Sequence, residues 1–258
     1  ISKESRDFIN SSLVFLIFLP EMERLFVTSP SQRRNFIDKM IFTENKNYNQ
    51  LINKYKKNLF ERNKLLQSYD YDKSWINTLE VEISKNALEI YKLRKNQINI
   101  LNENIKIINE NNKYPFNIKF NMIDQLVQHD QTADIFQSLL RQNRDYDRHF
   151  GGSKIGPHKS DIASKINENI DASQLSTGQQ KTLVLISLIA QCNYLVNSRK
   201  FQPILLFDEI CSHLDETNRE ILLDLTEKFK IQFFLTGTEK SLFSFMSTKS
   251  TFYNITEL

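Results

Sequence analysis

Two short segments near the end of this 258-residue sequence carry residues suited to binding a nucleotide and a metal ion. The first, QLSTGQQK, contains Ser176 and Gly178 in a small polar turn that opens a predicted helix. A helix N-terminus presents free N–H groups and the positive end of the helix dipole, which suits a phosphate. The second, ILLFDEI, is an apolar strand that ends in Asp208 and Glu209. Such carboxylates can hold Mg²⁺ and orient water.

Each segment also has a purely structural explanation. Serine is a common N-cap residue, and acidic residues are frequent where a strand meets a loop. The order of the segments favours the functional interpretation, because SHLDE follows the acidic pair and all three lie within about forty residues.

In this order the segments resemble the distal half of an ATP-binding-cassette (ABC) ATPase head. The resemblance implies that Asp208 binds Mg²⁺ and that Glu209 is the general base. It also implies that the P-loop of a partner subunit holds most of the ATP molecule. This ATP contacts Ser176, Gly178 and Gln179 in the turn that opens the helix, the signature turn, and Asp215 in the loop after the acidic strand. An ATP-dependent, two-fold homodimer follows from this arrangement.

The sequence contains no P-loop motif. That motif, GxxxxGK followed by Ser or Thr, needs glycines so that backbone amides can wrap the phosphates. The chain has 5 Gly, and none begins the pattern. We therefore expect an ABC-type head whose N-terminal P-loop part is absent from this chain and lies upstream, so that the chain alone does not hydrolyse ATP. The alternative is a head that has lost its P-loop and binds nucleotide poorly or not at all.

Composition limits the class of protein only broadly. A hydrophobic content of 40% with 25% charged residues indicates a globular chain. A net charge of +3 is compatible with nucleic acid without identifying it. The two cysteines, Cys192 and Cys211, lack metal-ligand spacing, so we expect a reducing cytoplasm. The apolar run LVFLIFL at residues 13–19 is too short to span a bilayer, so we expect a buried central strand and no membrane segment.

Hydrophobic periodicity predicts an α/β fold with a parallel sheet flanked by helices and an inserted helical lobe. Residues 45–112 contain no Gly or Pro and repeat apolar residues at helical spacing, which predicts two or three long helices. In the last third, predicted strands alternate with helices, as in a parallel sheet. We expect a remnant of the N-terminal ATPase lobe at 1–44, a mainly helical lobe II at 45–146 and a C-terminal ATPase lobe at 147–258.

Basic residues gather at an arginine pair and along the first long predicted helix. A basic stripe of this kind can follow a phosphate backbone. From charge alone, a solvated helix face is the better explanation. The candidate DNA contacts are Arg33, Arg34, Lys54, Lys56, Lys57, Arg62 and Lys64.

Four stretches make the chain similar to the RecF family of bacterial recombination-repair proteins, which are relatives of the SMC-type ABC ATPases. They read FLPEMERLFVTSPSQRRNFID, YKKNLFERNKLL, NRDYDRHFGGSKIGPHKSDI and the run from QLSTGQQKTLVL to FFLTGTE. The chain departs from the family at Thr28, where glycine is usual, and at Lys159 and Ser160, where GPHRDDL is usual. It also has Asn218 at a commonly basic position, with Arg219 next to it.

The resemblance implies a cytoplasmic DNA-binding protein with ATP-dependent dimerisation and, in its complete form, weak ATPase activity. It also implies binding near single-strand/double-strand junctions, cooperation with RecO and RecR in loading recombinase at gaps, and roles in replication restart and SOS induction. One alternative is the nucleotide-binding subunit of a transporter, but such heads usually carry histidine where FFLTGTE has Thr236 and Thr238. Another is a nucleotide-free DNA-binding or interaction protein, which an upstream P-loop would exclude.

Overall fold

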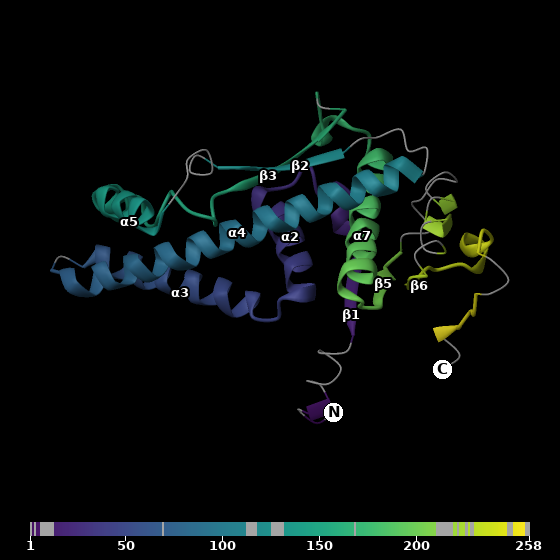
Figure 1. Cartoon of the computed structure of the whole chain (residues 1–258), viewed down its shortest axis with the longest axis horizontal. Coiled ribbons are helices and arrows are strands. Elements are labelled where there is room, and N and C mark those ends of the chain that lie inside the picture. Colours follow the sequence, from purple (N-terminus) through teal and green to yellow (C-terminus); the bar gives the residue numbers. More distant parts are fainter. Residues whose placement is uncertain are drawn as a thin grey trace. The chain divides into compact units, whose positions relative to one another are not determined.

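A parallel sheet of three strands carries the acidic pair. In this computed structural model, β1 (Val14–Phe18), β5 (Pro203–Phe207) and β6 (Gln232–Leu235) pair in that order (Figure 1). The last residues of the three strands pair with one another, so the strands end level. Parallel strands that end together bring the loops that follow them to one edge of the sheet. The parallel sheet expected from the sequence is confirmed.

Strand β1 lies at one edge of the described sheet, and β5 lies in the middle. The apolar run at residues 13–19 predicts a buried central strand. Its side chains alternate instead: Val14, Leu16 and Phe18 are buried, whereas Phe15 and Ile17 are each 43% exposed. Successive residues of a strand point to opposite faces, so only one face of β1 is deeply buried among the described residues.

Helix α7 (Thr177–Arg199) packs on this sheet through β1 and β5, and also contacts the 3-10 helix η1 (Pro20–Arg24). Every residue from 180 to 193 is buried. A helix that is buried on all sides belongs to a protein core. Its one buried cation, Lys181, is paired with Glu23 at 3.0 Å. The helix that follows QLSTGQQK is thus anchored on the strand layer that carries the acidic pair.

The polar segment predicted to be helical forms two long helices, as expected. They are α3 (Tyr48–Gln67) and α4 (Lys73–Asn111), which pack side by side (Figure 1). Apolar side chains at helical spacing along α4 are buried, whereas Trp75 is 48% exposed; the buried ones are Leu79, Ile83, Tyr91, Leu101, Ile105 and Ile108. The other elements between residues 26 and 174 are α2 (Pro30–Glu44), β2 (Ile118–Ile123), α5 (Ala133–Gln142), α6 (Arg144–Phe150), β3 (Asp161–Ile166), β4 (Ile170–Asp171) and the 3-10 helix η2 (Ala172–Gln174).

The strands β2, β3 and β4 form a separate antiparallel sheet, in which β3 pairs with both neighbours. The hairpin expected between residues 161 and 170 corresponds to β3 and β4. Antiparallel strands need only a short turn between them, and Asn167 and Asn169 lie in that turn. Near the end of the chain, the 3-10 helix η4 (Lys240–Phe243) follows β6.

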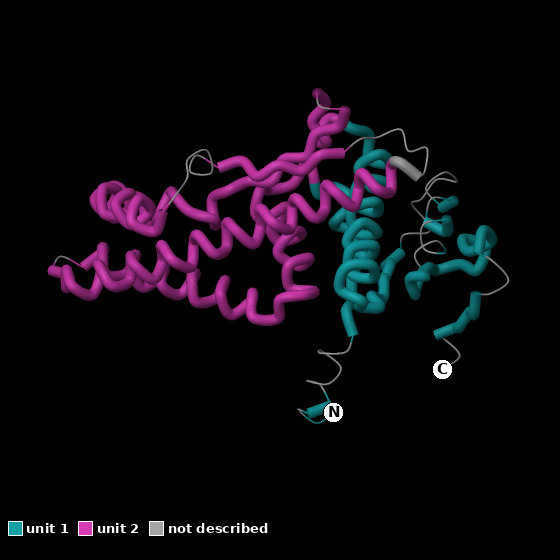
Figure 2. The backbone as a smooth tube through the Cα atoms, viewed as in Figure 1, with its two compact units in different colours: residues 1–25, 175–258 teal, residues 26–174 magenta. Residues whose placement is uncertain are grey.

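The chain divides into two compact units (Figure 2). Unit 1 comprises residues 1–25 and 175–258, and unit 2 comprises residues 26–174. These boundaries differ from the three segments expected from the sequence, because α2 and β3 pack with each other and α2 packs on α4. The structure describes residues 2, 4–5, 13–68, 70–111, 118–124, 132–167, 169–209, 219–220, 222–224, 227, 230–246 and 250–255. Within these ranges no helix has the length and apolar character needed to cross a membrane.

Candidate functional site

The signature turn begins α7 with a reciprocal cap. Ser176 Oγ accepts a hydrogen bond from the Gln179 N–H at 3.3 Å, and Gln179 Oε1 accepts one from the Ser176 N–H at 3.0 Å. This capping box explains why the helix begins at this residue. It also engages the Ser176 hydroxyl and the Gln179 side chain, two of the groups expected to meet ATP.

The backbone of the same turn remains open to a ligand. The first N–H groups of a helix have no partner within the helix, and a phosphate can satisfy them. A Cβ atom added at Gly178 would meet no atom within 4 Å, so the space beside the turn is clear. The structure therefore gives Ser176 a capping role, and its contact with a phosphate stays a prediction.

The two acidic residues lie where the three parallel strands end. The Asp208 N–H donates to the Phe18 carbonyl at 3.1 Å, and the Thr236 N–H donates to the Phe207 carbonyl at 3.0 Å. These bonds continue the strand pairing by one residue on each side of β5. Asp208 and Thr236 are thereby fixed at the carboxyl edge of the sheet, the edge at which α/β sheets bind ligands.

Thr236 joins the two acidic residues to each other. Its hydroxyl donates to Asp208 Oδ1 at 2.8 Å and accepts from the Glu209 N–H at 3.0 Å. The sequence analysis noted Thr236 only as the residue that replaces a transporter histidine. A polar residue directly after the neighbouring strand of the sheet was the signal that could have placed it in the site.

Glu209 has a backbone φ of 52°, in the left-handed region. A residue other than glycine pays roughly 1–3 kcal/mol for such a conformation, and these conformations cluster at functional sites. The turn directs the chain out of β5 immediately after Asp208. Asp208 and Glu209 are both exposed at this edge, as groups that meet solvent and substrate must be.

The donor set at this edge fits a magnesium ion. No group of three or more His, Cys, Asp or Glu side chains with metal-binding geometry occurs in the parts of the chain that the structure describes. Magnesium does not need such a group, because it keeps several waters and is bound by one or two carboxylates together with substrate phosphates. Asp208, oriented by Thr236, provides one carboxylate of this kind.

The structure presents the signature turn and the acidic edge as two separate places in unit 1. The hydrogen bonds of Ser176 stay within its own turn, and those of Asp208 stay at the sheet edge. This separation is compatible with a turn that meets nucleotide held by a second subunit. Asp215 and Ser212, expected in the loop that crosses such an interface, lie outside the described residues.

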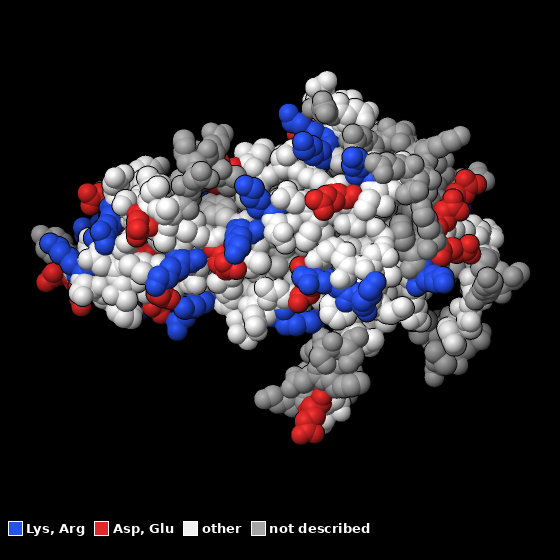
Figure 3. Space-filling view, viewed as in Figure 1, with Lys and Arg blue, Asp and Glu red and all other residues white. Residues whose placement is uncertain are grey.

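The residues of the predicted basic stripe all lie in unit 2. Some are exposed lysines, and others are arginines that bind acidic side chains or carbonyls of the protein. Lys54 pairs with Glu82 at 2.6 Å, and Lys57 lies 3.9 Å from Glu61. Exposed pairs of this kind contribute little stability, so the lysines stay available for other partners. On the face shown in Figure 3, basic and acidic side chains are interspersed and do not form one continuous basic patch.

Arg62 is corrected from a surface contact to a core residue. It is 1% exposed, and its guanidinium donates to Glu80 at 3.0 Å, to Asp147 at 2.7 Å and to the Leu140 carbonyl at 2.7 Å. The helical period indicated this position, because Arg62 falls on the same face of α3 as the buried Tyr55. The basic stripe was predicted from charge alone, without regard to the helical period, and Arg62 was therefore included in it.

The arginine pair is also tied to the protein. Arg33 forms a two-pronged ion pair with Asp161, with both N–O distances 2.8 Å, and donates to the carbonyls of Phe26 and Thr28. Arg34 donates to the Ser160 carbonyl at 2.5 Å. Arg33 therefore fastens α2 to β3, and Arg34 is the member of the pair that keeps donors for another partner.

The chain is similar in sequence to proteins named RecF. No family model matches the chain. A "DNA replication and repair protein RecF" of Rickettsia bellii is 30% identical over 233 residues, which is 89% of this chain and 64% of the relative. The RecF of Rickettsia typhi is 33% identical over 88% of this chain and 64% of the relative. The RecF of Rhizobium rhizogenes is 28% identical over 96% of this chain and 68% of the relative.

Solved structures show the same fold. The recombination mediator protein RecF with ATP, in the RecFOR pathway, aligns with a TM-score of 0.73 at 23% identity, over 88% of this chain and 63% of that chain. The form of that protein with ATPrS aligns equally well. The chain thus spans 64% of the length of the two Rickettsia relatives described above. In sequence the chain is therefore similar to proteins named RecF over most of its own length, and it shares the fold of a solved RecF structure.

Proposed function

We propose that this chain provides the signature turn and the catalytic carboxylates of a RecF-type ATPase that acts in recombinational DNA repair and replication restart. The observation that carries the proposal is the acidic edge of the parallel sheet, where Thr236 holds Asp208 and the backbone of Glu209 together. Similarity to RecF proteins supports it, since these relatives carry the name DNA replication and repair protein. ATP hydrolysis and DNA binding are proposed for the complete protein.

Each residue at the edge has a chemical task in this proposal. Asp208 supplies a carboxylate oxygen to Mg²⁺, while Thr236 fixes the orientation of that carboxylate. When bound, the metal neutralises negative charge on the phosphates. Glu209 accepts the proton of the water that attacks the terminal phosphate, as general base. These are the tasks that the resemblance assigned, and the geometry of the edge is suited to them.

The signature turn acts in the assembled protein. Ser176, Gly178 and Gln179 contact ATP held by a second copy, with Asp215 in the crossing loop, so that ATP closes a homodimer. The open space beside Gly178 supports this role. We further propose that the complete protein is cytoplasmic, binds DNA near single-strand/double-strand junctions and works with RecO and RecR. The segments 1–44, 45–146 and 147–258 remain the proposed ATPase, helical and C-terminal ATPase lobes.

The acidic edge is tested by Glu209→Gln in the complete reading frame that contains this chain. The amide keeps the shape of the side chain but accepts no proton, so ATP hydrolysis should fall by about 10²-fold or more. ATP binding should persist, and the ATP-bound dimer should live longer. Glu220→Gln is the matched control, because Glu220 is an exposed acidic residue of unit 1 that follows none of the three strands directly. A turnover within about twofold of the parent protein would exclude Glu209 as the base.

A further inference from the structure

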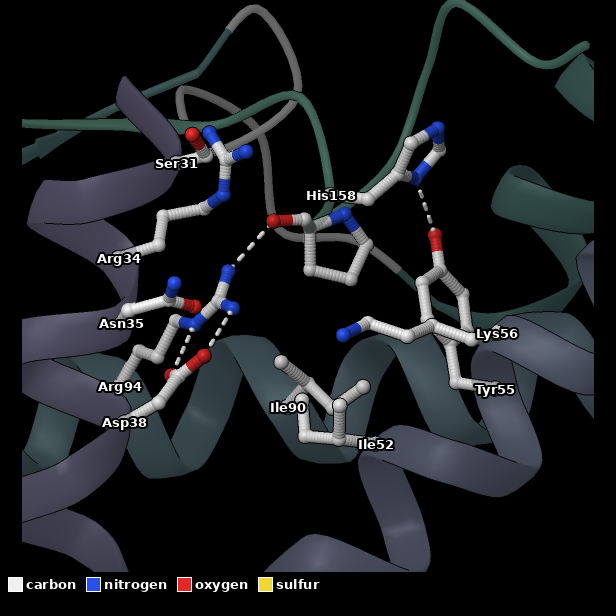
Figure 4. Close-up of a pocket in the computed structure, with 11 residues that line it drawn as sticks. Ser31, Arg34, Asn35, Asp38, Ile52, Tyr55, Lys56, Ile90, Arg94 and His158 are labelled. Carbon is white, nitrogen blue, oxygen red and sulfur yellow. Dashed lines mark hydrogen bonds and ion pairs between the residues drawn. The ribbon is translucent and has the colours of Figure 1, made fainter. Parts of the chain in front are cut away.

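A pocket of about 290 Å³ lies within unit 2, between α2, α3, α4 and the turn that precedes β3 (Figure 4). It lies wholly in the unit that lacks the acidic edge and the signature turn. Its volume is close to the lower limit for small-molecule sites in proteins. The groups that line it divide into neutral walls, a neutralised ion pair and two further cations.

One wall is fixed by two neutral side chains. His158 Nε2 lies 3.0 Å from the Ser153 carbonyl, which can only accept, so Nε2 carries the proton. His158 Nδ1 then accepts from the Tyr55 hydroxyl, 2.8 Å away. Burial lowers the pKa of His158 to about 4, so the ring is neutral at pH 7. A Cβ atom at Gly156 would lie 2.4 Å from the Tyr55 hydroxyl, so only glycine fits behind this wall.

A second wall is a neutralised ion pair. Arg94, which is 3% exposed, binds both carboxylate oxygens of Asp38 at 2.8 Å. It also donates to the Pro157 carbonyl and to Ser160 Oγ. Its donors are therefore committed to the protein, and Asp38 balances its charge. This pair shapes the pocket without adding net charge to it.

Two cations remain without a carboxylate. Among the described residues, neither Arg34 nor Lys56 takes part in an ion pair, whereas Arg33 and Arg94 each do. Figure 4 shows Lys56 reaching from α3 into the pocket, with Arg34 on the α2 side. Burial and the nearby Arg94 lower the pKa of Arg34, and the charges of Asp161 and Asp38 offset this only in part. An anion placed between Arg34 and Lys56 would relieve this imbalance.

We propose that this pocket binds a phosphate monoester, with Lys56 and Arg34 holding the phosphate. The two surplus positive charges match a monoester, which carries close to two negative charges at pH 7. The Arg34 guanidinium suits phosphate oxygens, and Lys56 acts as a point charge. Ile52 and Ile90 form an apolar floor for a sugar-sized organic group. The ligand is either a free nucleotide or the phosphorylated end of a nucleic-acid strand, which share this chemistry.

The proposal extends beyond ATP hydrolysis, and its test is run without ATP. Calorimetric titration of the complete protein would use thymidine monophosphate against thymidine, and a short single strand with and without a 5′-phosphate. We expect one phosphorylated ligand to bind at least about tenfold more tightly than its unphosphorylated counterpart, since hydrogen bonds between charged groups are strong. Preference for the mononucleotide identifies a nucleotide site, and preference for the phosphorylated strand alone identifies a strand-end site.

Lys56→Glu should abolish this preference for the phosphorylated ligand. Lys92→Glu is the matched control, because Lys92 is an exposed lysine of α4, two residues before the pocket-lining Arg94, and does not itself line the pocket. Lys56→Gln and Arg34→Gln should weaken the preference partly, since each removes one of the two cations. The proposal is wrong if no phosphorylated ligand is preferred, or if Lys56→Glu and Lys92→Glu reduce the preference equally.

Discussion

Replacing Arg62 with alanine should destabilise unit 2 strongly. Arg62, Glu80 and Asp147 are all at most 1% exposed as side chains, and Arg62 links the two acids with N–O distances of 3.0 and 2.7 Å. Glu80 keeps a second partner in Arg144 at 2.5 Å, whereas Arg62 is the ion-pair partner that the structure gives Asp147. Removing one member of a buried ion pair costs about 3–5 kcal/mol, because the remaining charge is left in a medium of low polarity.

The measurement is urea-induced unfolding followed by circular dichroism, with Lys64→Ala as the control on the same helix. Lys64 is in the last turn of α3 and exposed, so its loss should change the free energy of unfolding by about 0.5 kcal/mol or less. Burial raises the pKa of Asp147 even with Arg62 present, so Asp147→Asn should recover part of the loss in the Arg62→Ala background. An Arg62→Ala protein of unchanged stability but reduced DNA affinity would refute the core position and restore the surface role.

Two further predictions concern the wall of the unit 2 pocket. The pKa of His158 is about 4 in the folded chain, against its ordinary value of 6.5, so the unfolded chain binds more protons between these values. The contribution of neutral His158 to the free energy of unfolding is therefore fully present above pH 6.5, and roughly 3 kcal/mol is lost as the pH falls towards 4. His158→Gln should remove this loss, which is measured by comparing the free energies of unfolding at the two pH values. Gly156→Ala should destabilise the protein by about 1–3 kcal/mol more than Gly152→Ala. Both glycines have an unusual φ, +124° and +151°, but only a Cβ atom at Gly156 would clash with Tyr55. Equal shifts of the thermal unfolding midpoint would contradict this.

The elements that carry the candidate site follow local sequence rules. The cap at Ser176 and the apolar strand before Asp208 are set by neighbouring residues, and both were predicted from the sequence. The long helices α3 and α4 were predicted for the same reason, since their apolar spacing is a property of each helix alone. Resemblance to RecF then supplied the roles of these residues, which spacing did not.

The contacts that the sequence analysis missed join residues far apart in the chain. Thr236 meets Asp208 only because β6 pairs with β5 in one register, and the two residues are 28 positions apart. Arg33 meets Asp161 across 128 positions. The motif GPHKSDI was recognised as a family feature, but its task of anchoring Arg33, Arg34 and Arg94 depends on how α2 and α4 pack against the turn before β3. Such tertiary partners have no signature in a single sequence.

The central claim is that this chain supplies half of an ATP site shared between two copies. Sedimentation of the complete protein with and without ATP, comparing Ser176→Arg with Ser198→Arg, tests it most directly. Ser198 is exposed near the other end of α7, so it controls for the added cation. The account predicts that Ser176→Arg binds ATP but no longer dimerises with it, while Ser198→Arg dimerises normally. A Ser176→Arg protein that still dimerises with ATP would show that the turn is only a capped helix start, and would contradict the shared site.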